Sequence, residues 1–346
     1  MNIAITGLNS TDNPGPGVPV IRSIRAEKKF KGRIIGLVYD SLEPGIYFDD
    51  LIESYYTIPY PSSGKNLLLE RISYIHKKEK IDLIIPTLDS EILGFISIEN
   101  DLRKMGIKTF LPTAVQYNLR AKDKLFNLCQ KNKIKVPRNI LATSLKDIAT
   151  IQEHFSYPIV VKGIFYDASI AHNFEEAVVA FNKLSLKWGY PIIIQEFVHG
   201  SEFNVVALGD GLGNTIGAVA MKKLYITDKG KGWSGVTIDD EEILKISKTA
   251  IKAMKWRSGL ELEFIKSSTT NEFYLLEINP RFPAWVYLAP NAGQNLPFAL
   301  VELAMGKKIT PFTKYKIGAM FIRTSWDLIS DMSTFEKITV NGELKK

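Results

Sequence analysis

Two strand-like segments around residue 270 carry carboxylates on one face, and this pattern constrains the chain more than any other. The stretch 259–281, GLELEFIKSSTTNEFYLLEINPR, predicts an antiparallel hairpin closed by the polar turn SSTTN. Side chains alternate between the two faces of a strand, so Glu261 and Glu263 share one face of the first segment. Glu277 and Asn279 share one face of the second. Oxygen ligands from both strands can therefore converge.

Two carboxylates and an amide oxygen form a donor set that suits a hard cation. Mg²⁺ usually takes one or two protein carboxylates, and water and substrate phosphates fill its other positions. Arg281, two residues after Asn279, would add a fixed positive fork for phosphoryl oxygens. Charged alternation is also ordinary on a solvated hairpin. These residues alone leave both interpretations open.

Composition describes a globular chain with room for a large core. Of its 346 residues 45% are hydrophobic, so we expect two or three subdomains. The net charge of +7 comes from scattered lysines, which suits anionic ligands such as nucleotides and argues against nucleic-acid binding. The single cysteine, Cys129, excludes an internal disulfide and a multi-cysteine metal site, and its apolar helical context predicts a buried thiol.

The chain begins MNIAITG, which predicts a strand rather than a signal peptide. No apolar run approaches the length of about 18 residues that a membrane span needs. We expect a cytoplasmic protein without a membrane segment.

Strands and helices alternate in the first third of the chain, which predicts an α/β fold with a parallel, doubly wound sheet. The expected strands are 2–6, 33–39 and 81–86, and the expected helices are 18–29, 66–78 and 91–104. Residues 1–115 are therefore interpreted as a Rossmann-like domain. The loop GLNSTDNPGPG lacks the GxGxxG spacing, which disfavours a dinucleotide-dependent oxidoreductase.

Polar residues follow two strands of this predicted sheet. Ligands of such sheets bind outside the carboxyl ends of the strands, so Asn9, Ser10, Asp89 and Glu91 are candidate ligand contacts. The family resemblance given below implies that this ligand is a second substrate. Capping of the following helix by Asp89 or Ser90 is an equally good explanation for either residue.

The motif EINPR, with Glu263 fourteen positions before Glu277, resembles the metal-binding hairpin of the ATP-grasp superfamily. The resemblance is to the branch that contains carbamoyl-phosphate synthetase, biotin carboxylase and amino-acid ligases such as the pyrrolysine-pathway ligase. It implies ATP and Mg²⁺ as cofactors, with Mn²⁺ as an alternative ion, and Glu263, Glu277 and Asn279 as the metal ligands.

The resemblance also implies a nucleotide site along the preceding residues. Lys124, with Lys122 as the fallback, and Lys162 would reach phosphates, although the loop after Lys162 is shorter and poorer in glycine than the family's. The pattern E-x-x-x-G-x-E resembles the family's hinge. It implies an adenine pocket lined by Glu196, Phe197 and Val198, with Glu202 on the ribose.

Further residues are implied near the phosphates. Lys222 leaves a strand there, in a Lys- and Gly-rich stretch, 221–237, that we expect to be a flexible flap. Arg281, Lys162 and Arg323 would act in catalysis. Where biotin carboxylases place a catalytic glutamate this chain has AWVY, 284–287, which disfavours a carboxylase.

We therefore expect a Rossmann-like domain at 1–115, an ATP-grasp domain at 116–306 with lobes 116–195 and 196–306, and a small cap at 307–346. The implied activity is that of a carboxylate-amine ligase, a carbon-nitrogen ligase that works through an acyl phosphate and serves amino-acid, peptide-modification or cofactor biosynthesis. Its partners would be ATP, a carboxylate and an amine. A regulatory nucleotide-binding protein and an enzyme that phosphorylates bicarbonate or a carbamate stay open as alternatives. The two substrates, and whether the chain forms a homodimer, are left open as well.

Overall fold

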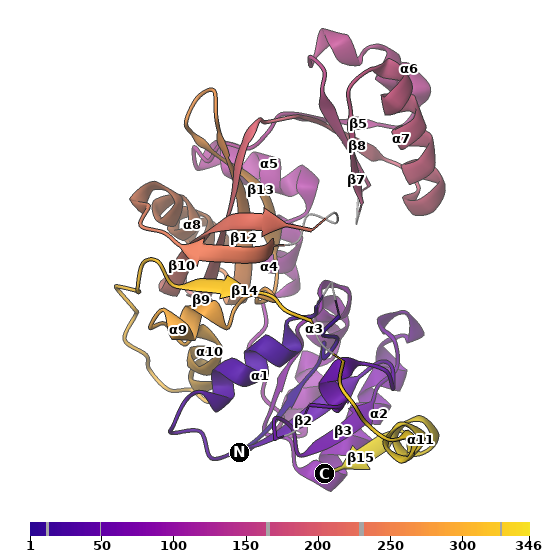
Figure 1. Cartoon of the computed structure of the whole chain (residues 1–346), viewed down its shortest axis with the longest axis vertical. Helices are drawn as coiled ribbons and strands as arrows, with labels where there is room; N and C mark the ends of the chain where they lie inside the picture. Colours follow the sequence, from indigo (N-terminus) through magenta and orange to yellow (C-terminus); the bar gives the residue numbers. More distant parts are fainter. Residues whose placement is uncertain (12–13, 49, 164–166, 228–231, 326) are drawn as a thin grey trace. The chain divides into compact units, whose positions relative to one another are not determined.

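The structure is a computed structural model that describes residues 1–11, 14–48, 50–163, 167–227, 232–325 and 327–346 (Figure 1). The side chains of Lys122 and Asp123 also lie outside the described part. The chain forms two compact units, and each contains separate stretches of sequence. Unit 1 comprises residues 1–121, 203–262 and 278–346, and unit 2 comprises residues 122–202 and 263–277.

Unit 1 contains a five-stranded sheet in the order β15-β3-β2-β1-β4. Strands β1 to β4 pair in parallel, and β15 adds antiparallel at the edge. Their bounds are β1 Asn2–Ile5, β2 Arg33–Val38, β3 Ser54–Thr57, β4 Leu83–Ile85 and β15 Glu343–Lys345. This is the arrangement that alternating strands and helices predict for the start of the chain.

Helices cover both faces of this sheet because its strands are apolar on both sides. Ile3 and Ile5 pack with buried residues of α1 (Gly17–Arg25), and Ala4 packs with those of α2 (Lys65–Glu79) and α3 (Asp89–Lys104). Each large side chain buried in this way contributes roughly 1.5–3 kcal/mol. The carboxyl ends of β1, β2 and β4 thus stay at one sheet edge, where the loops after them carry polar residues.

A six-stranded sheet has the order β13-β12-β9-β10-β11-β14. Its strands are β9 Gly200–Asp210, β10 Thr215–Ile226, β11 Gly232–Thr237, β12 Arg257–Ser267, β13 Phe273–Asn279 and β14 Met320–Ile322. Strands β12 and β13 form the predicted hairpin. The helix α8 (Glu241–Met254) precedes it and buries Ile243, Ala250 and Met254, as its 3.6-residue period predicts.

Unit 2 holds a four-stranded antiparallel sheet in the order β5-β8-β6-β7. Its strands are β5 Asn139–Ala142, β6 Ile159–Lys162, β7 Ala168–Ala171 and β8 Ile192–Glu196. The helix α7 (Phe174–Trp188) packs Ala177, Phe181 and Leu184 into the core of this sheet. The central position of β6, between β7 and β8, fixes the direction in which its last residue, Lys162, leaves the sheet.

The other helices have at most ten residues each. The α-helices are α4 Ala114–Leu119, α5 Lys122–Lys131, α6 Leu145–Ala149, α9 Leu288–Asn291, α10 Leu296–Ala304 and α11 Met332–Asn341, and the 3-10 helices are η1 Pro44–Ile46, η2 Pro61–Ser63 and η3 Ile151–Glu153. None of the helices in the described ranges is both long and apolar enough to cross a membrane. Cys129 on α5 is buried, as predicted, and burial raises the pKa of its thiol to about 12.

Two expectations are corrected here. The supposed flap is largely strand, because β10 and β11 pair with each other through Ile226 and Gly232; residues 228–231 lie outside the described part. The last forty residues form no separate cap. Instead β14 pairs with β11 and β15 pairs with β3, so the chain's end, yellow in Figure 1, contributes to two sheets of unit 1.

Candidate active site

Unit 2 brings together a lysine and two carboxylates of the predicted site. Lys162 is the last residue of β6 and is partly buried, while Glu263 on β12 and Glu277 on β13 are partly exposed. Burial lowers the pKa of the Lys162 ammonium, and the nearby charges of Glu277 and Glu263 oppose that effect. A cation near two carboxylates can offset phosphoryl charge while the carboxylates hold a metal ion. The expected loop after Lys162, including Tyr166, lies partly outside the described residues.

The predicted adenine hinge follows β8. The side chain of Glu196 accepts hydrogen bonds from Nε of Arg138 at 2.8 Å and from the Arg138 backbone N–H at 3.2 Å. The Glu196 carboxylate is thus held by Arg138, and the adenine contact expected of residues 196–198 stays a prediction. Phe197 packs edge-on against His199, with ring centroids 4.6 Å apart. Val198 is the residue between them in the sequence.

The hinge has room only for a glycine at position 200. A Cβ at this position would lie 2.0 Å from the carbonyl oxygen of Lys266, which no side chain tolerates. The neighbouring carbonyl of His199 accepts a hydrogen bond from the Ser268 N–H at 2.9 Å. The turn is thereby tied to the hairpin loop of the same unit. Glu202 follows on β9 and is partly buried.

Lys124 lies on α5 and is exposed. The side chain of the fallback residue, Lys122, lies outside the described part of the chain. The phosphate role of either lysine therefore stays a prediction.

Unit 1 contains a buried carboxylate that the sequence did not single out as a site residue. Glu261 is 5% exposed, and its Oε2 accepts hydrogen bonds from Nδ2 of Asn279 at 3.1 Å and Nη1 of Arg281 at 3.0 Å. Its Oε1 accepts from Nδ2 of Asn204 at 2.6 Å and Nε1 of Trp285 at 2.7 Å. The signal in the sequence was its place on the same strand face as Glu263.

Electrostatics keeps this carboxylate ionised. Burial alone would raise the pKa of Glu261, but Arg281 and the hydrogen bonds from Trp285 and Asn204 outweigh burial and hold that pKa below its usual range. Lys223 acts in the same direction. Glu261 thus interacts favourably with positively charged side chains of unit 1.

Arg281 connects the hairpin with the predicted substrate edge of the parallel sheet. Its Nε donates to Oδ2 of Asp89 at 2.9 Å, and its side chain is 11% exposed. The structure therefore brings together Asp89, predicted to contact a second substrate, and Arg281, predicted to bind phosphoryl oxygens. Because Asp89 and Glu261 flank the guanidinium, its orientation is fixed from two sides.

The other predicted substrate residues divide into two kinds. Asn9 and Ser10 are partly buried in the loop after β1, where the Asn9 carbonyl accepts from the Gly15 N–H at 2.7 Å. Glu91 is 1% exposed and accepts from the hydroxyls of Thr6 and Tyr39. It also accepts from the backbone N–H groups of residues 87 and 88 at 2.7 and 2.8 Å.

The expected substrate contact of Glu91 is corrected by these bonds. Its carboxyl group is saturated by donors of the protein and caps the start of α3, the task that sequence reasoning offered to Asp89 or Ser90. A side chain three residues into a helix can reach back to its N-terminus, whereas one at the first position cannot. Asp89 stays the candidate substrate contact at this sheet edge.

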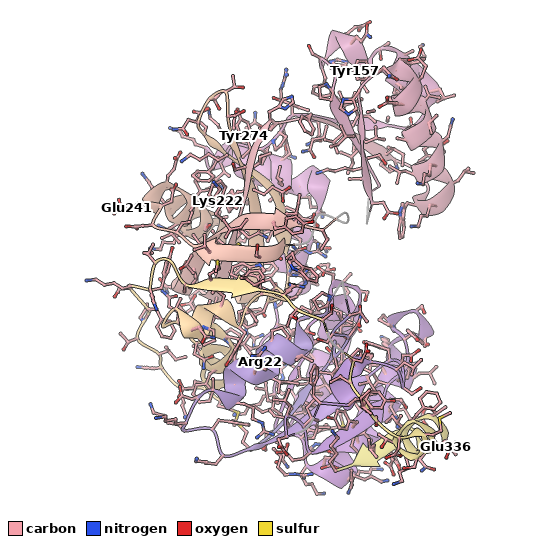
Figure 2. The ribbon with its side chains drawn as sticks, viewed as in Figure 1. Arg22, Tyr157, Lys222, Glu241, Tyr274 and Glu336 are labelled. Carbon is pink, nitrogen blue, oxygen red and sulfur yellow. The ribbon has the colours of Figure 1, made fainter. Side chains whose placement is uncertain are left out.

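Two further cations were predicted near the phosphates. Lys222 lies on β10, and its ammonium is 5.8 Å from the centre of the Phe203 ring (Figure 2). Arg323 follows β14, and its backbone N–H donates to the Trp233 carbonyl at 2.9 Å. Burial lowers the pKa of Arg323, and the charge of Glu261 opposes that effect, so Arg323 is near this carboxylate.

Comparison with known proteins identifies the fold. Residues 190–320 match the family described as "ATP-grasp in the biosynthetic pathway with Ter operon". The chain contains an ATP-grasp domain. The resemblance drawn from the hairpin motif is thus confirmed.

Relatives of the ATP-grasp domain cover most of the chain. The N-terminal section of the carbamoyl phosphate synthase large chain from Methanopyrus kandleri is 26% identical over 272 residues, which are 72% of this chain and 48% of that protein. The chain therefore spans about half the length of this relative, and about a quarter of the undivided large chains.

Solved structures with the same fold cover still more. Biotin carboxylase from Campylobacter jejuni has a TM-score of 0.72 at 15% identity, over 92% of this chain and 74% of that one. L-amino acid ligase from Bacillus licheniformis has a TM-score of 0.67 at 16% identity, over 89% and 75% of the two chains.

The ATP-grasp domain has no cluster of three or more His, Cys, Asp or Glu side chains arranged for a metal within the residues that the structure describes. Within unit 2 the hairpin offers two carboxylates, Glu263 and Glu277, as ligands. Such a set leaves room for phosphate oxygens and water, as Mg²⁺ requires.

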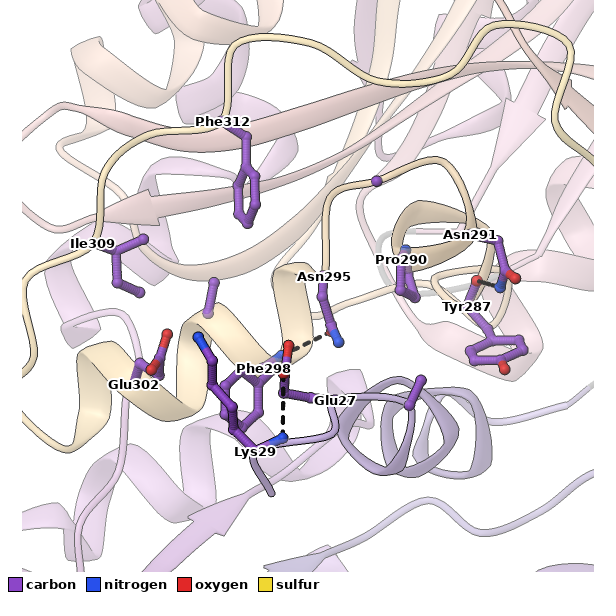
Figure 3. A pocket seen from close by; sticks show the side chains of 13 residues that line it. Glu27, Lys29, Tyr287, Pro290, Asn291, Asn295, Phe298, Glu302, Ile309 and Phe312 are labelled. Carbon is purple, nitrogen blue, oxygen red and sulfur yellow. Dashed lines mark hydrogen bonds between the residues drawn. The ribbon is translucent and has the colours of Figure 1, made fainter. Parts of the chain in front are cut away.

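A cavity of about 360 Å³ lies elsewhere in unit 1, between the end of α1 and α10 (Figure 3). Glu27, Lys29, Tyr287, Phe298 and Phe312 are among its lining residues. None of the predicted site residues lines it. The predicted site residues therefore lie apart from this cavity.

Glu43, behind the substrate edge of the parallel sheet, gives a prediction on stability. It is 8% exposed, its Oε2 has no hydrogen-bond partner among the described residues, and burial raises its pKa to about 7. A carboxyl whose folded pKa exceeds its unfolded value favours the folded state at low pH, so this contribution is lost as the pH rises to about 7. We expect it to amount to up to about 3 kcal/mol.

Glu43→Gln should therefore remove that part of the pH dependence. The measurement is urea denaturation between pH 4.5 and 8, with the exposed Glu70→Gln on α2 as the control. Parallel pH dependences of wild type and Glu43→Gln would contradict the assignment.

Proposed function

We propose that this chain is an ATP- and Mg²⁺-dependent carbon-nitrogen ligase that activates a carboxylate as an acyl phosphate and joins it to an amine. The observation that carries the proposal is the electrostatic interaction of Lys162 with Glu277 and Glu263 within unit 2. The relatives support it, since an L-amino acid ligase and a biotin carboxylase share the fold. ATP, the acid and the amine would be its partners.

The donor set fits a magnesium ion. Glu263 and Glu277 supply hard anionic oxygens, and Asn279, two residues after Glu277, supplies an amide oxygen. When bound, Mg²⁺ would neutralise charge on the triphosphate and polarise its γ-phosphoryl group. No side chain of the protein has to act as a covalent nucleophile.

The chain's own residues would position the phosphoryl group and offset its charge. In the first step an oxygen of the substrate carboxylate bonds to the γ-phosphorus, and the bond from that phosphorus to the bridging oxygen of ADP breaks. Lys162 and Lys124 would offset charge on the transferring oxygens. The family resemblance assigns the same task to Arg281 and Arg323.

In the second step the amine nitrogen attacks the acyl carbon. The carbon-oxygen bond to phosphate breaks, phosphate leaves, and the nitrogen loses a proton. Asp89 would attract the amine as an ammonium ion at the edge of the parallel sheet. Its ion pair with Arg281 gives both substrates a common reference point within unit 1.

The test uses hydroxylamine in place of the amine. With the correct acid from a panel of amino acids and small carboxylic acids, the enzyme should form a hydroxamate and release ADP and phosphate in equal amounts. Lys162→Met should lose this activity, while Lys146→Met, an exposed lysine on α6 of the same unit, should keep it. Tight ATP binding with neither ADP nor hydroxamate from any acid would favour a regulatory nucleotide-binding protein.

A second candidate function is phosphorylation of bicarbonate or a carbamate. The likeness to the carbamoyl phosphate synthase large chain favours it. Against it, residues 284–287 provide no carboxylate after Arg281. Stimulation of ADP release by bicarbonate alone would select this function over the ligase.

A further inference from the structure

We propose that Glu261 is a positioning residue that aims the amide oxygen of Asn279 and the guanidinium of Arg281 at the reacting phosphates. The inference deepens the proposed function and rests on it. It assigns a task to a residue that no metal or phosphate role had claimed. The argument begins with the saturation of this carboxylate.

Each oxygen of Glu261 accepts two hydrogen bonds, from Asn279 and Arg281 on one side and from Asn204 and Trp285 on the other. The donors come from β9, β13 and the segment after β13, all within unit 1. A buried carboxylate held by four donors has one orientation. It can serve as a fixed reference for the groups it holds.

The orientation of Asn279 follows from chemistry. An ionised carboxylate has no hydrogen to donate, so the amide atom that faces Oε2 of Glu261 at 3.1 Å must be the nitrogen. The carbonyl oxygen of the same amide therefore points away from Glu261. Asn279 is 6% exposed, so its side chain is enclosed by protein. Glu261 thus determines which atom of Asn279 can act as a ligand.

Arg281 is fixed by the same residue. Oε2 of Glu261 accepts a hydrogen bond from Nη1 of Arg281 at 3.0 Å. Oδ2 of Asp89 accepts one from Nε of the same guanidinium at 2.9 Å. Two bonds to a planar group define its plane, and so define the direction of its other N–H donors. A lysine at this position could not be aimed in this way, because its ammonium rotates freely.

The alternative is that Glu261 only stabilises the fold as part of a buried ion pair. The two roles differ in what a neutral isostere does to metal binding. Outer partners of metal ligands typically change metal affinity by about 10–100-fold when they are replaced. A purely structural carboxylate would change the melting temperature and leave the metal affinity of the folded protein as it was.

The experiment measures Mn²⁺ binding by electron paramagnetic resonance, in the presence of a non-hydrolysable ATP analogue. Glu261→Gln should weaken Mn²⁺ binding by about 10–100-fold with analogue affinity nearly unchanged. Glu272→Gln is the matched control, since it removes a partly exposed carboxylate, paired with Lys135, on the loop of the same hairpin. It should bind Mn²⁺ like wild type.

A second substitution tests the amide argument directly. In the double variant E261Q/N279D the new glutamine can donate to the new aspartate and leave one of its oxygens facing outward, so Mn²⁺ affinity should return to within about threefold of wild type. Glu261→Asp keeps the negative charge near Arg281 but shortens the side chain by one methylene, which withdraws its oxygens from Asn279 and Arg281 alike. It should weaken Mn²⁺ binding even if E261Q folds poorly.

The outcomes separate the two proposals. Equal Mn²⁺ binding by wild type, E261Q and E261D would overturn the role of Glu261 and leave the proposed ligase intact. A double variant that binds no better than folded E261Q would overturn the aiming of Asn279. Absence of nucleotide-dependent Mn²⁺ binding in wild type would overturn the proposed function, and the role of Glu261 with it.

Discussion

Replacing Glu277 with glutamine should reduce Mg²⁺-dependent turnover by about a hundredfold or more while the protein stays folded. The substitution keeps the shape of the side chain but removes one of two anionic ligands on the hairpin. It also removes the first of the two charges that support the Lys162 ammonium against burial. Both losses weaken the stabilisation of charge on the transferring phosphoryl group. Preorganised charge of this kind typically contributes a factor of about 10²–10³ to the rate.

The pH dependence separates these two contributions. Glu277 raises the pKa of Lys162, so in Glu277→Gln that pKa falls further and the active ammonium is lost at lower pH. The alkaline limb of the kcat profile should therefore move toward neutral pH. Excess Mg²⁺ should recover part of the metal loss and leave the shifted limb in place.

The measurement is initial rate against Mg²⁺ concentration between pH 6 and 10, with Glu272→Gln as the control. Thermal denaturation of both variants checks that the fold is kept. Full activity of Glu277→Gln at ordinary Mg²⁺ concentrations would remove Glu277 from the metal site.

The hairpin and the parallel sheet were predictable because both depend on local pattern. Alternation of polar and apolar residues in the stretch 259–281 indicates two strands, and the structure has them as Arg257–Ser267 and Phe273–Asn279. The order of strand and helix in the first hundred residues likewise indicates a parallel sheet. Helix α7 carried the same kind of signal in Ala177, Phe181 and Leu184, although it was not predicted.

The pairings of the chain's end could not be predicted in this way. β14 and β15 have three residues each, too short to show a period, and their partners β11 and β3 are set by long-range packing. The division into two units has the same cause. The chain passes from unit 1 into unit 2 at residue 263 and returns to unit 1 at residue 278. No change of composition marks these two points.

The roles of the acidic residues depend on burial, which alternation does not report. Glu261 and Glu263 lie on one face of the same strand. Of the two, only Glu261 is buried, and Trp285 and Asn204 donate hydrogen bonds to it there. Glu91 likewise looked like a ligand by its position after a strand, and the hydroxyls of Thr6 and Tyr39 make it a structural residue. The sequence pattern identifies the candidate carboxylates, and their packing decides which of them are buried structural groups.

Arg281→Met should lower the free energy of unfolding by roughly 3–5 kcal/mol, the effect expected when a buried charge loses its partner. Glu261 would keep its hydrogen bonds from Trp285, Asn204 and Asn279 but lose the first charge that offsets its burial. Asp89 would lose its partner as well. By comparison, Lys135→Met breaks the exposed ion pair with Glu272 and should cost at most about 1 kcal/mol.

The sign of the pH dependence tests whether the charge of Glu261 is the cause. In wild type the folded pKa of Glu261 is below its usual value, so this carboxylate favours folding above that value, and the benefit is lost as the pH falls. Without Arg281, burial dominates and the folded pKa rises above the unfolded one, which reverses the slope. The destabilisation by Arg281→Met should therefore grow from pH 4 to pH 7 in urea denaturation, and E261Q in the same chain should recover part of it at pH 7. A loss that is independent of pH, or that E261Q does not reduce, would mean that Arg281 stabilises the unit through packing alone.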